Sequence, residues 1–264
     1  MRLAGPPRSV PTLSVDASDG VALAYRVFGG ADADPDLRPV VLVHGFASSG
    51  ETTWGLTGWI ARMLESSRAV VVPDLRGHGA SGKPREAAAY TPERLGRDLL
   101  AVADAAGAEE VDLVGYSLGT RVISAFAALA PERIGRIVFG GAGERPMFDT
   151  WDGAAARAVL AGEAASADPL VQQLLVPALA AGADARVLAS VIEGMAAAPL
   201  GVPDGIPLCM VVGAADPVPV GARGLAERWG AEFLELPGRD HVSTVRASAF
   251  QRAAIAFLDP GPAD

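Results

Sequence analysis

Short hydrophobic runs alternate with segments of helical periodicity along most of this chain. Residues 21–28 alternate between apolar and polar side chains, as a half-buried strand does. Further short apolar runs, rich in β-branched residues, lie at 40–43, 69–72, 111–114, 134–139 and 207–212. Runs of this kind are typical of strands that helices cover on both faces. The pattern therefore predicts a mainly parallel sheet with helices on both sides.

The helical segments between these runs have recognisable starts and stops. Thr91 and Pro92 supply an N-cap and a first-turn proline for one helix. The segment 118–130 has an apolar face, and Pro131 ends it. A last helix is predicted around 250–257, where the apolar residues again share one face.

One region breaks the alternation. Residues 142–205 contain alanine-rich helical segments broken by glycine and proline, with no strand signal. We expect 1–141 and 206–264 to form one α/β core that this helical segment interrupts. Because open α/β sheets bind ligands beyond the carboxyl ends of their strands, the insertion is interpreted as a lid over that edge. The alternative is a plain outer layer of packing helices.

Composition and charge narrow the range of partners. The 264 residues are 50% hydrophobic and 20% charged, a balance that suits a globular core. With a net charge of −9 and no block of Lys or Arg, the chain is not expected to bind nucleic acid or an anionic membrane. The sequence shows no secretory or membrane-spanning hydrophobic stretch, so a cytoplasmic location is expected. The single cysteine, Cys209, lies in a predicted strand, and one cysteine excludes an intramolecular disulfide.

The strongest chemical signal is the Gly-x-Ser-x-Gly segment at residues 115–119, between a predicted strand and a predicted helix. Such a turn presents the serine to substrate and places the N–H of Leu118 beside any oxyanion formed there. A serine hydroxyl is a weak nucleophile until a base takes its proton. Ser117 therefore requires a histidine and an orienting acid from elsewhere in the chain.

Three histidines are candidates for the base. His44 closes a predicted strand and is interpreted as shaping the loop that follows. His78 lies in a glycine-rich turn, where a local hydrogen bond is expected. His241 follows the last predicted strand, on the carboxyl edge of the sheet where Ser117 also lies. We therefore expect His241 to be the base.

The acid is expected from a strand end on the same edge. Asp216 follows a predicted buried strand through a turn of small residues. Its alternative role is a turn or helix-cap carboxylate, which is common before a proline. Asp240 is a rival, but neighbouring side chains in extended chain diverge, so it is poorly placed to face His241. Asp149 and Asp152 belong to the insertion and would move with it.

Two backbone N–H groups are candidates for an oxyanion hole. That of Leu118 follows the nucleophile, and that of Phe46 follows the predicted third strand, where Gly45 allows a close approach. Trp54 is a candidate for the pocket wall, with core packing as an equal alternative. Three more residues, at the start of the insertion, are candidates for lining the substrate pocket: Met147, Phe148 and Trp151.

Two phosphate-binding patterns are rejected. Residues 77–82 match Gly-x-Gly-x-x-Gly, but Lys83 and Pro84 follow where a helix should begin. The same stretch nearly matches a phosphate loop, but Pro84 replaces the Ser or Thr that would hold magnesium. No group of His, Cys and acidic residues has metal-ligand spacing. We therefore expect no cofactor and no metal.

Five segments in this order resemble the α/β-hydrolase fold superfamily over nearly the whole chain, in particular its serine carboxylesterases and lipases. They are His44-Gly45-Phe46, residues 74–81, residues 115–119, residues 213–216 and Asp240-His241. The resemblance implies a mainly parallel eight-stranded α/β sheet flanked by helices, with a helical lid. It also implies a catalytic triad of Ser117, Asp216 and His241, with oxyanion N–H groups from Phe46 and Leu118.

Two positions bear on the activity that this resemblance implies. Thr120 stands where many relatives carry a second glycine, and position 117 is serine, unlike the aspartate nucleophile of haloalkane dehalogenases and epoxide hydrolases. The expected activity is a serine hydrolase that acts on a small ester or related acyl compound. Lactone opening, carbon–carbon bond cleavage, acyl transfer and non-catalytic ligand sensing are the alternatives. Carbon–carbon cleavage needs a basic group for a carboxylate; Arg121 and Arg145 are candidates, although both are expected to be solvated.

Overall fold

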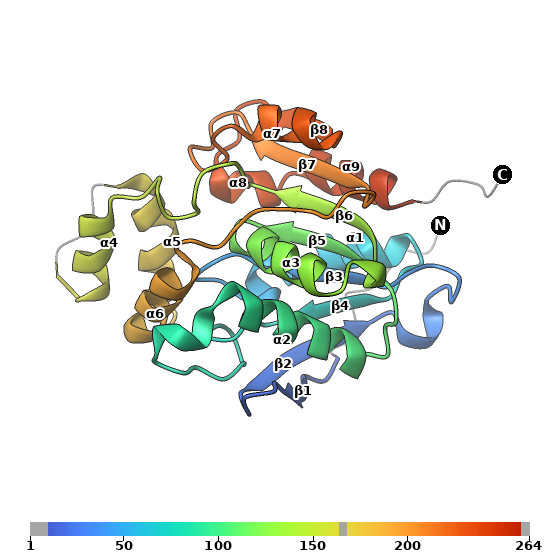
Figure 1. Ribbon diagram of the computed structural model, residues 1–264, viewed down its shortest axis with the longest axis horizontal. Helices are drawn as coiled ribbons and strands as arrows, with labels where there is room; N and C mark the ends of the chain where they lie inside the picture. The colour runs from blue at the N-terminus through green and yellow to red at the C-terminus, as the bar shows by residue number, and fades with distance from the viewer. Residues whose placement is uncertain (1–9, 164–167, 260–264) are drawn as a thin grey trace.

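The computed structural model describes residues 10–163 and 168–259, which form one mixed sheet with helices on both faces (Figure 1). The sheet has eight strands in the order β1-β2-β4-β3-β5-β6-β7-β8. The pairings β1–β2 and β2–β4 are antiparallel, and the other pairings are parallel. The strands are β1 (Leu13–Asp16), β2 (Ala22–Phe28), β3 (Val40–Val43), β4 (Val70–Pro73), β5 (Val111–Tyr116), β6 (Ile134–Gly140), β7 (Leu208–Gly213) and β8 (Glu232–Leu236). The predicted eight-stranded, mainly parallel sheet is confirmed.

Four of the inner strands are buried along their whole length, as their unbroken apolar runs predict. Every residue of β3, β4, β5 and β7 is buried. The edge strands β1 and β8 expose at least part of their residues instead. Helices therefore cover both faces of the central strands, which explains why their sequences do not alternate.

Two groups of helices enclose the sheet. Side chains of α2, α3 and α7 pack in one hydrophobic core, and those of α1 and α9 pack in a second core on the opposite face. The α-helices outside the insertion are α1 (Trp59–Glu65), α2 (Pro92–Ala105), α3 (Leu118–Leu129), α7 (Ala222–Trp229), α8 (His241–Val245) and α9 (Ser248–Leu258). Short 3-10 or π turns occur at Gly30–Asp32, Glu51–Gly55, Ala87–Tyr90 and Pro131–Arg133. The predicted N-cap is present, since the Thr91 side chain accepts from the N–H of Arg94.

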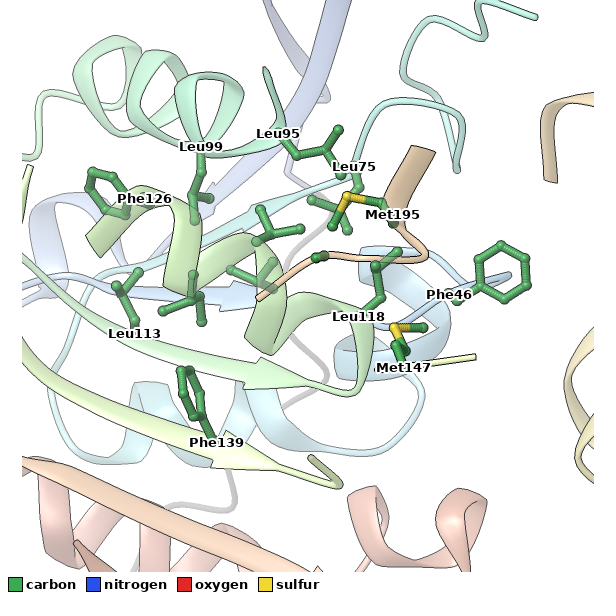
Figure 2. Close-up of a cluster of buried hydrophobic side chains, with 14 of the residues drawn as sticks. Phe46, Leu75, Leu95, Leu99, Leu113, Leu118, Phe126, Phe139, Met147 and Met195 are labelled. Atoms are coloured by element: carbon green, nitrogen blue, oxygen red, sulfur yellow. The ribbon is translucent and has the colours of Figure 1, made fainter. Parts of the chain in front are cut away.

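The first core holds α2 and α3 against the strand that leads to Ser117. Figure 2 shows Leu99 of α2 and Phe126 of α3 facing each other, with Leu113 of β5 and Phe139 of β6 below them. Each of these four side chains is at most 2% exposed. The start of α3 is thereby fixed on the sheet by a close-packed interior.

The insertion between β6 and β7 is helical, as the sequence predicts. It contains α4 (Gly153–Leu160), α5 (Pro169–Ala180) and α6 (Ala185–Met195), and the described part of 142–205 contains no strand. Asp152, Asp168 and Asp184 each cap one of these helices with a side-chain oxygen. Figure 1 shows the three helices grouped beyond one end of the sheet, on the side where α8 begins.

None of the helices in the described ranges is both long and apolar enough to span a bilayer. Cys209 is buried in β7, and burial raises the pKa of its thiol to about 12. Such a thiol is protonated at neutral pH and unreactive.

Candidate active site

Ser117 lies at the junction of β5 and α3 in a strained backbone conformation. Its φ of 52° and ψ of −115° fall outside the regions that non-glycine residues usually occupy. Neighbouring backbone holds it there: the Ser117 N–H donates to Gly140 O at 2.9 Å, and the Thr120 N–H and hydroxyl donate to Ser117 O at 3.0 and 2.6 Å. Strain of this kind is often stored at functional sites. Ser117 is 8% exposed.

Three glycines give the chain room to make this turn. A Cβ on Gly119 would lie 2.1 Å from Val43 O, and one on Gly115 would lie 2.7 Å from the Ile123 side chain. A Cβ on Gly45 would lie 3.4 Å from Ser117 Cβ and 4.0 Å from Ser117 Oγ. The loop after β3 therefore passes directly beside the serine, and α3 packs closely on β3.

His241 and Asp216 form a buried hydrogen-bonded pair. His241 Nδ1 lies 2.8 Å from Asp216 Oδ2, and the two side chains are 3% and 0% exposed. The second oxygen, Asp216 Oδ1, accepts from the N–H of Val218 at 2.9 Å. Asp216 follows β7, and His241 is the first residue of α8, so each belongs to a segment that starts at the same edge of the sheet. A carboxylate in this position fixes the ring orientation and favours a proton on Nδ1.

Asp240, the alternative candidate for the acid, is the N-cap of α8. Its side chain caps α8: Oδ1 accepts from the Ser243 N–H at 2.8 Å and from the Ser243 hydroxyl at 2.6 Å, and the Asp240 N–H donates to Ser243 Oγ. These hydrogen bonds lower the pKa of Asp240. The expectation that Asp216 rather than Asp240 faces His241 agrees with this geometry.

Ser117 and His241 both lie against Gly140 and Gly141, at the end of β6. Ser117 N–H binds Gly140 O, and a Cβ on Gly141 would lie 3.1 Å from His241 Cε1. Within residues 10–163 and 168–259, Ser117 Oγ and His241 are not hydrogen-bonded to each other. Such contacts are often loose in a site without substrate and tighten in the complex.

The other two histidines are fixed in structural hydrogen bonds, in line with their interpretation from the sequence. His44 Nε2 accepts from the Leu75 N–H at 3.0 Å, and His44 Nδ1 lies 2.7 Å from Gly45 O. His78 Nε2 accepts from the Ala47 N–H at 3.2 Å. Burial lowers the pKa of His44, and burial together with His44 lowers the pKa of His78 to about 3. Both rings are therefore neutral, with their acceptor nitrogens occupied.

The two N–H groups expected to form an oxyanion hole are free to bind a ligand. Within the described ranges, neither Phe46 N nor Leu118 N has a hydrogen-bond partner. Leu118 is the first residue of α3, where the helix dipole adds a partial positive charge. Ala47, with φ of 54°, turns the chain after Phe46.

The candidate pocket residues divide into two groups. Met147 is buried in the core that contains α2 and α3, and Phe148 and Trp151 pack against the same core, with ring centroids 5.3 and 5.7 Å from that of Phe46. Trp54 is fully buried in the opposite core, and its ring packs on Trp59 at 5.2 Å. The placement of Trp54 in a pocket wall is therefore corrected to its alternative, core packing.

Arg121 is buried, which differs from its expected solvation. Arg145 is exposed as expected, but Arg121 is 5% exposed. Its guanidinium donates to Gly143 O at 2.9 Å and Arg145 O at 2.6 Å, and within the described ranges it forms no salt bridge. Burial lowers the pKa of Arg121 to about 10. The one signal of this burial in the sequence is that Arg121 is the single charged residue of a mainly apolar helix.

No group of three or more His, Cys, Asp or Glu residues in the described part of the chain is placed to hold a metal ion.

Comparison with known proteins gives similarity to one family of enzymes. A family model described as "alpha/beta hydrolase fold" matches residues 38–172. Epoxide hydrolase B of Mycobacterium tuberculosis is 36% identical over 115 residues, which are 43% of this chain and 32% of that protein. The 2-hydroxy-6-oxo-2,4-heptadienoate hydrolase of Pseudomonas putida is 38% identical over 105 residues, 40% of this chain and 37% of that protein. The chain thus spans about a third of the length of these curated relatives.

Solved structures extend the similarity to nearly the whole fold. A hydrolase from Pseudomonas aeruginosa superimposes with a TM-score of 0.73 at 25% identity, covering 94% of this chain and 98% of the other. The relatives named above carry different reactions in their names, so the similarity alone does not select a substrate.

Proposed function

This chain belongs to the alpha/beta hydrolase fold family, and we propose that it is a serine hydrolase that cleaves a carboxylic ester or related acyl compound through an acyl-enzyme on Ser117. The observation that carries the proposal is the buried pair of His241 Nδ1 and Asp216 Oδ2 at 2.8 Å, beside the strained turn that presents Ser117. Hydrolase chemistry is common to the family. The serine nucleophile and the ester substrate are the specific parts of the proposal.

The first half-reaction is nucleophilic attack. His241 Nε2 takes the proton of Ser117 Oγ, which attacks the carbonyl carbon of the ester. Asp216 holds the ring with its proton on Nδ1 and stabilises the imidazolium that forms. Because both partners are buried, this electrostatic support is stronger than it would be in water.

The N–H groups of Phe46 and Leu118 stabilise the negative charge on the carbonyl oxygen. They have no partner within the described ranges, so they require no rearrangement before they bind the oxyanion. His241 then protonates the leaving alcohol. In the second half-reaction the same ring takes a proton from water, which attacks the acyl carbon, and returns that proton to Ser117 Oγ as the acyl bond breaks and the acid leaves.

The proposal is tested by labelling and by substitution. A fluorophosphonate probe should attach to Ser117, with the adduct located by peptide mass mapping. Ser117→Ala should abolish labelling and reduce kcat on small nitrophenyl esters by about three orders of magnitude or more. Ser124→Ala is the matched control, because Ser124 lies on the same helix and its hydroxyl bonds to Thr120 O. Near-normal turnover by Ser117→Ala would reject the proposal.

A second candidate function is hydrolysis of a carbon–carbon bond in a substrate that carries a carboxylate. The observation that favours it is Arg121, a buried guanidinium on the helix that begins next to Ser117, with no carboxylate partner in the described part of the chain. The Pseudomonas putida relative bears the name of such a hydrolase. This candidate would be favoured over the ester hydrolase if the protein cleaved an unsaturated 1,5-diketone that carries a carboxylate and did not cleave nitrophenyl esters.

A further inference from the structure

Three aromatic rings form a closed cluster between the loop after β3 and the start of the insertion. The ring centroids of Phe46 and Phe148 are 5.3 Å apart, those of Phe46 and Trp151 are 5.7 Å apart, and those of Phe148 and Trp151 are 5.4 Å apart. The interplanar angles are 79°, 67° and 88°, so every pair is edge to face. Edge-to-face contacts are the favoured geometry for aromatic groups.

This cluster adjoins the proposed reaction centre. Phe46 supplies a free N–H, and the preceding Gly45 lies against Ser117. Figure 2 places Phe46 at the margin of the core, with its ring directed away from Leu113 and Phe139. Phe46 is 3% exposed, whereas Phe148 and Trp151 are only half-buried and retain ring surface that a substrate can cover.

Arg121 fixes the segment that carries two of these rings. Its guanidinium binds the carbonyls of Gly143 and Arg145, and the Glu144 N–H donates to Val220 O at 2.9 Å. The root of the insertion is therefore attached both to α3 and to the loop that follows Asp216. Phe148 comes three residues after Arg145, so its ring is held near Phe46 rather than left on a free loop.

We propose that Phe148 and Trp151 are specificity-determining residues that hold an aryl group of the substrate against the surface they leave exposed while its carbonyl lies at Ser117. The proposal rests on the ester hydrolase function above and names its substrate class, esters that carry an aromatic ring. An aryl ring and a cyclohexyl ring bury similar apolar area, but only the aryl ring has the quadrupole that edge-to-face contacts use. The cluster therefore distinguishes the two rings by electrostatics as well as by size.

The experiment compares two matched pairs of esters by pH-stat. Methyl benzoate and methyl cyclohexanecarboxylate test an aryl group on the acyl side, and phenyl acetate and cyclohexyl acetate test one on the alcohol side. The measured quantity is the ratio of kcat/KM for the aryl ester to that for the cyclohexyl ester. Relative to the wild type, Phe148→Leu and Trp151→Leu should lower this ratio roughly 3- to 10-fold in at least one pair.

Two further variants control for general damage. Phe233→Leu removes a half-buried ring on β8 that stacks on Arg223 at 4.6 Å, and its ratio should equal that of the wild type. Trp151→Phe keeps an aromatic ring and should retain most of the aryl preference. Equal losses on aryl and cyclohexyl esters in the leucine variants, with unchanged ratios, would show a structural role only and would overturn the proposal.

A binding measurement separates this proposal from the function on which it rests. Ser117→Ala should bind acetophenone more tightly than cyclohexyl methyl ketone, as calorimetry would measure, and Trp151→Leu in that background should remove the difference. Equal binding of the two ketones by Ser117→Ala would overturn the aryl site. Full esterase activity in Ser117→Ala would instead reject the assignment of Ser117 as the nucleophile. The difference in affinity between the two ketones would still test the aryl site at Phe148 and Trp151.

Discussion

The hydroxyl of Tyr116 donates a 2.5 Å hydrogen bond to the backbone carbonyl of His241, and the two rings are 5.2 Å apart. The residue immediately before the proposed nucleophile therefore holds the backbone of the proposed base. Burial raises the pKa of Tyr116 well above its usual value, so the phenol stays protonated and remains a donor. β5 thus fixes the position of Ser117 and of His241 together.

Tyr116→Phe should impair catalysis more than it disturbs the fold. The substitution keeps the ring but leaves the buried carbonyl of His241 without its donor, which costs about 1–2 kcal/mol of stability. We expect kcat to fall several-fold with little change in KM, because the ring of His241 is less well aligned with Ser117. Urea denaturation and steady-state kinetics measure the two effects. An unchanged kcat would show that His241 is positioned without this bond.

Gly45→Ala and Gly119→Ala should separate crowding of the serine from disruption of the fold. A Cβ on Gly119 would lie 2.1 Å from Val43 O, a collision with backbone, so this variant should fail to accumulate as folded protein. A Cβ on Gly45 would lie 3.3 Å from Tyr116 O and 3.4 Å from Ser117 Cβ, which needs only a small shift. We expect Gly45→Ala to fold with nearly normal Tm and to lose most of its activity. Normal activity in that variant would show that the loop after β3 does not contact the reacting groups.

Most of the fold was predictable because its signals are local. The unbroken apolar runs at 40–43 and 111–114 are buried strands, and the turn at 115–119 joins β5 to α3. The expected pairing of His241 with Asp216 also followed from local signals, since each residue comes after a strand and parallel strands end at one edge.

The contacts that the sequence did not reveal depend on distant segments. Trp54 lies in the core on the α1 and α9 face, and nothing local distinguishes that environment from a pocket. Arg121 is buried because residues 143–145 fold back over α3, an arrangement that helical periodicity cannot show. The bond between Tyr116 and His241 joins residues 125 positions apart. Side-chain partners of this kind require the tertiary structure.

Asp98→Ala should destabilise the protein without touching the site. Arg76 is 1% exposed, and its guanidinium binds Asp98 through two hydrogen bonds of 2.5 and 2.6 Å. Without Asp98, the buried guanidinium of Arg76 keeps only its hydrogen bonds to Asp19 and Ala89 O. We therefore expect the free energy of unfolding to fall by about 3 kcal/mol. Urea denaturation measures the loss, and kcat at a temperature below the transition should be normal. A loss below about 1 kcal/mol would contradict the importance of this pair.

His78→Gln should reduce the acid sensitivity of the fold. The pKa of His78 is about 3 in the folded protein, against an ordinary histidine value of 6.5, so the unfolded chain binds more protons between these values. The free energy of unfolding therefore carries no penalty from His78 above pH 6.5. Below that pH it falls as the pH drops, by at most about 1.4 kcal/mol per pH unit for one histidine. Asp98 and Asp112, whose pKa values burial raises, act in the opposite direction. Urea denaturation at about pH 7 and about pH 5 should show a smaller difference for His78→Gln than for the wild type, and equal differences would contradict the assignment.

Asp216→Asn should lose activity, whereas Asp240→Asn should keep it. Asp216 contacts the His241 ring, and Asp240 precedes His241 in the sequence. Asparagine at 216 presents an amide to His241 Nδ1 and favours the tautomer whose Nε2 carries the proton, so Nε2 can no longer accept from Ser117. We expect kcat to fall roughly 10³- to 10⁴-fold. Asparagine at 240 is still a good N-cap for α8, so this variant should lose at most about 1 kcal/mol of stability and keep its activity. Kinetics on one nitrophenyl ester and thermal melting of both variants measure these outcomes. Because the two substitutions make the same chemical change, a larger loss of kcat in Asp240→Asn would assign the orienting acid to the cap and not to the buried carboxylate.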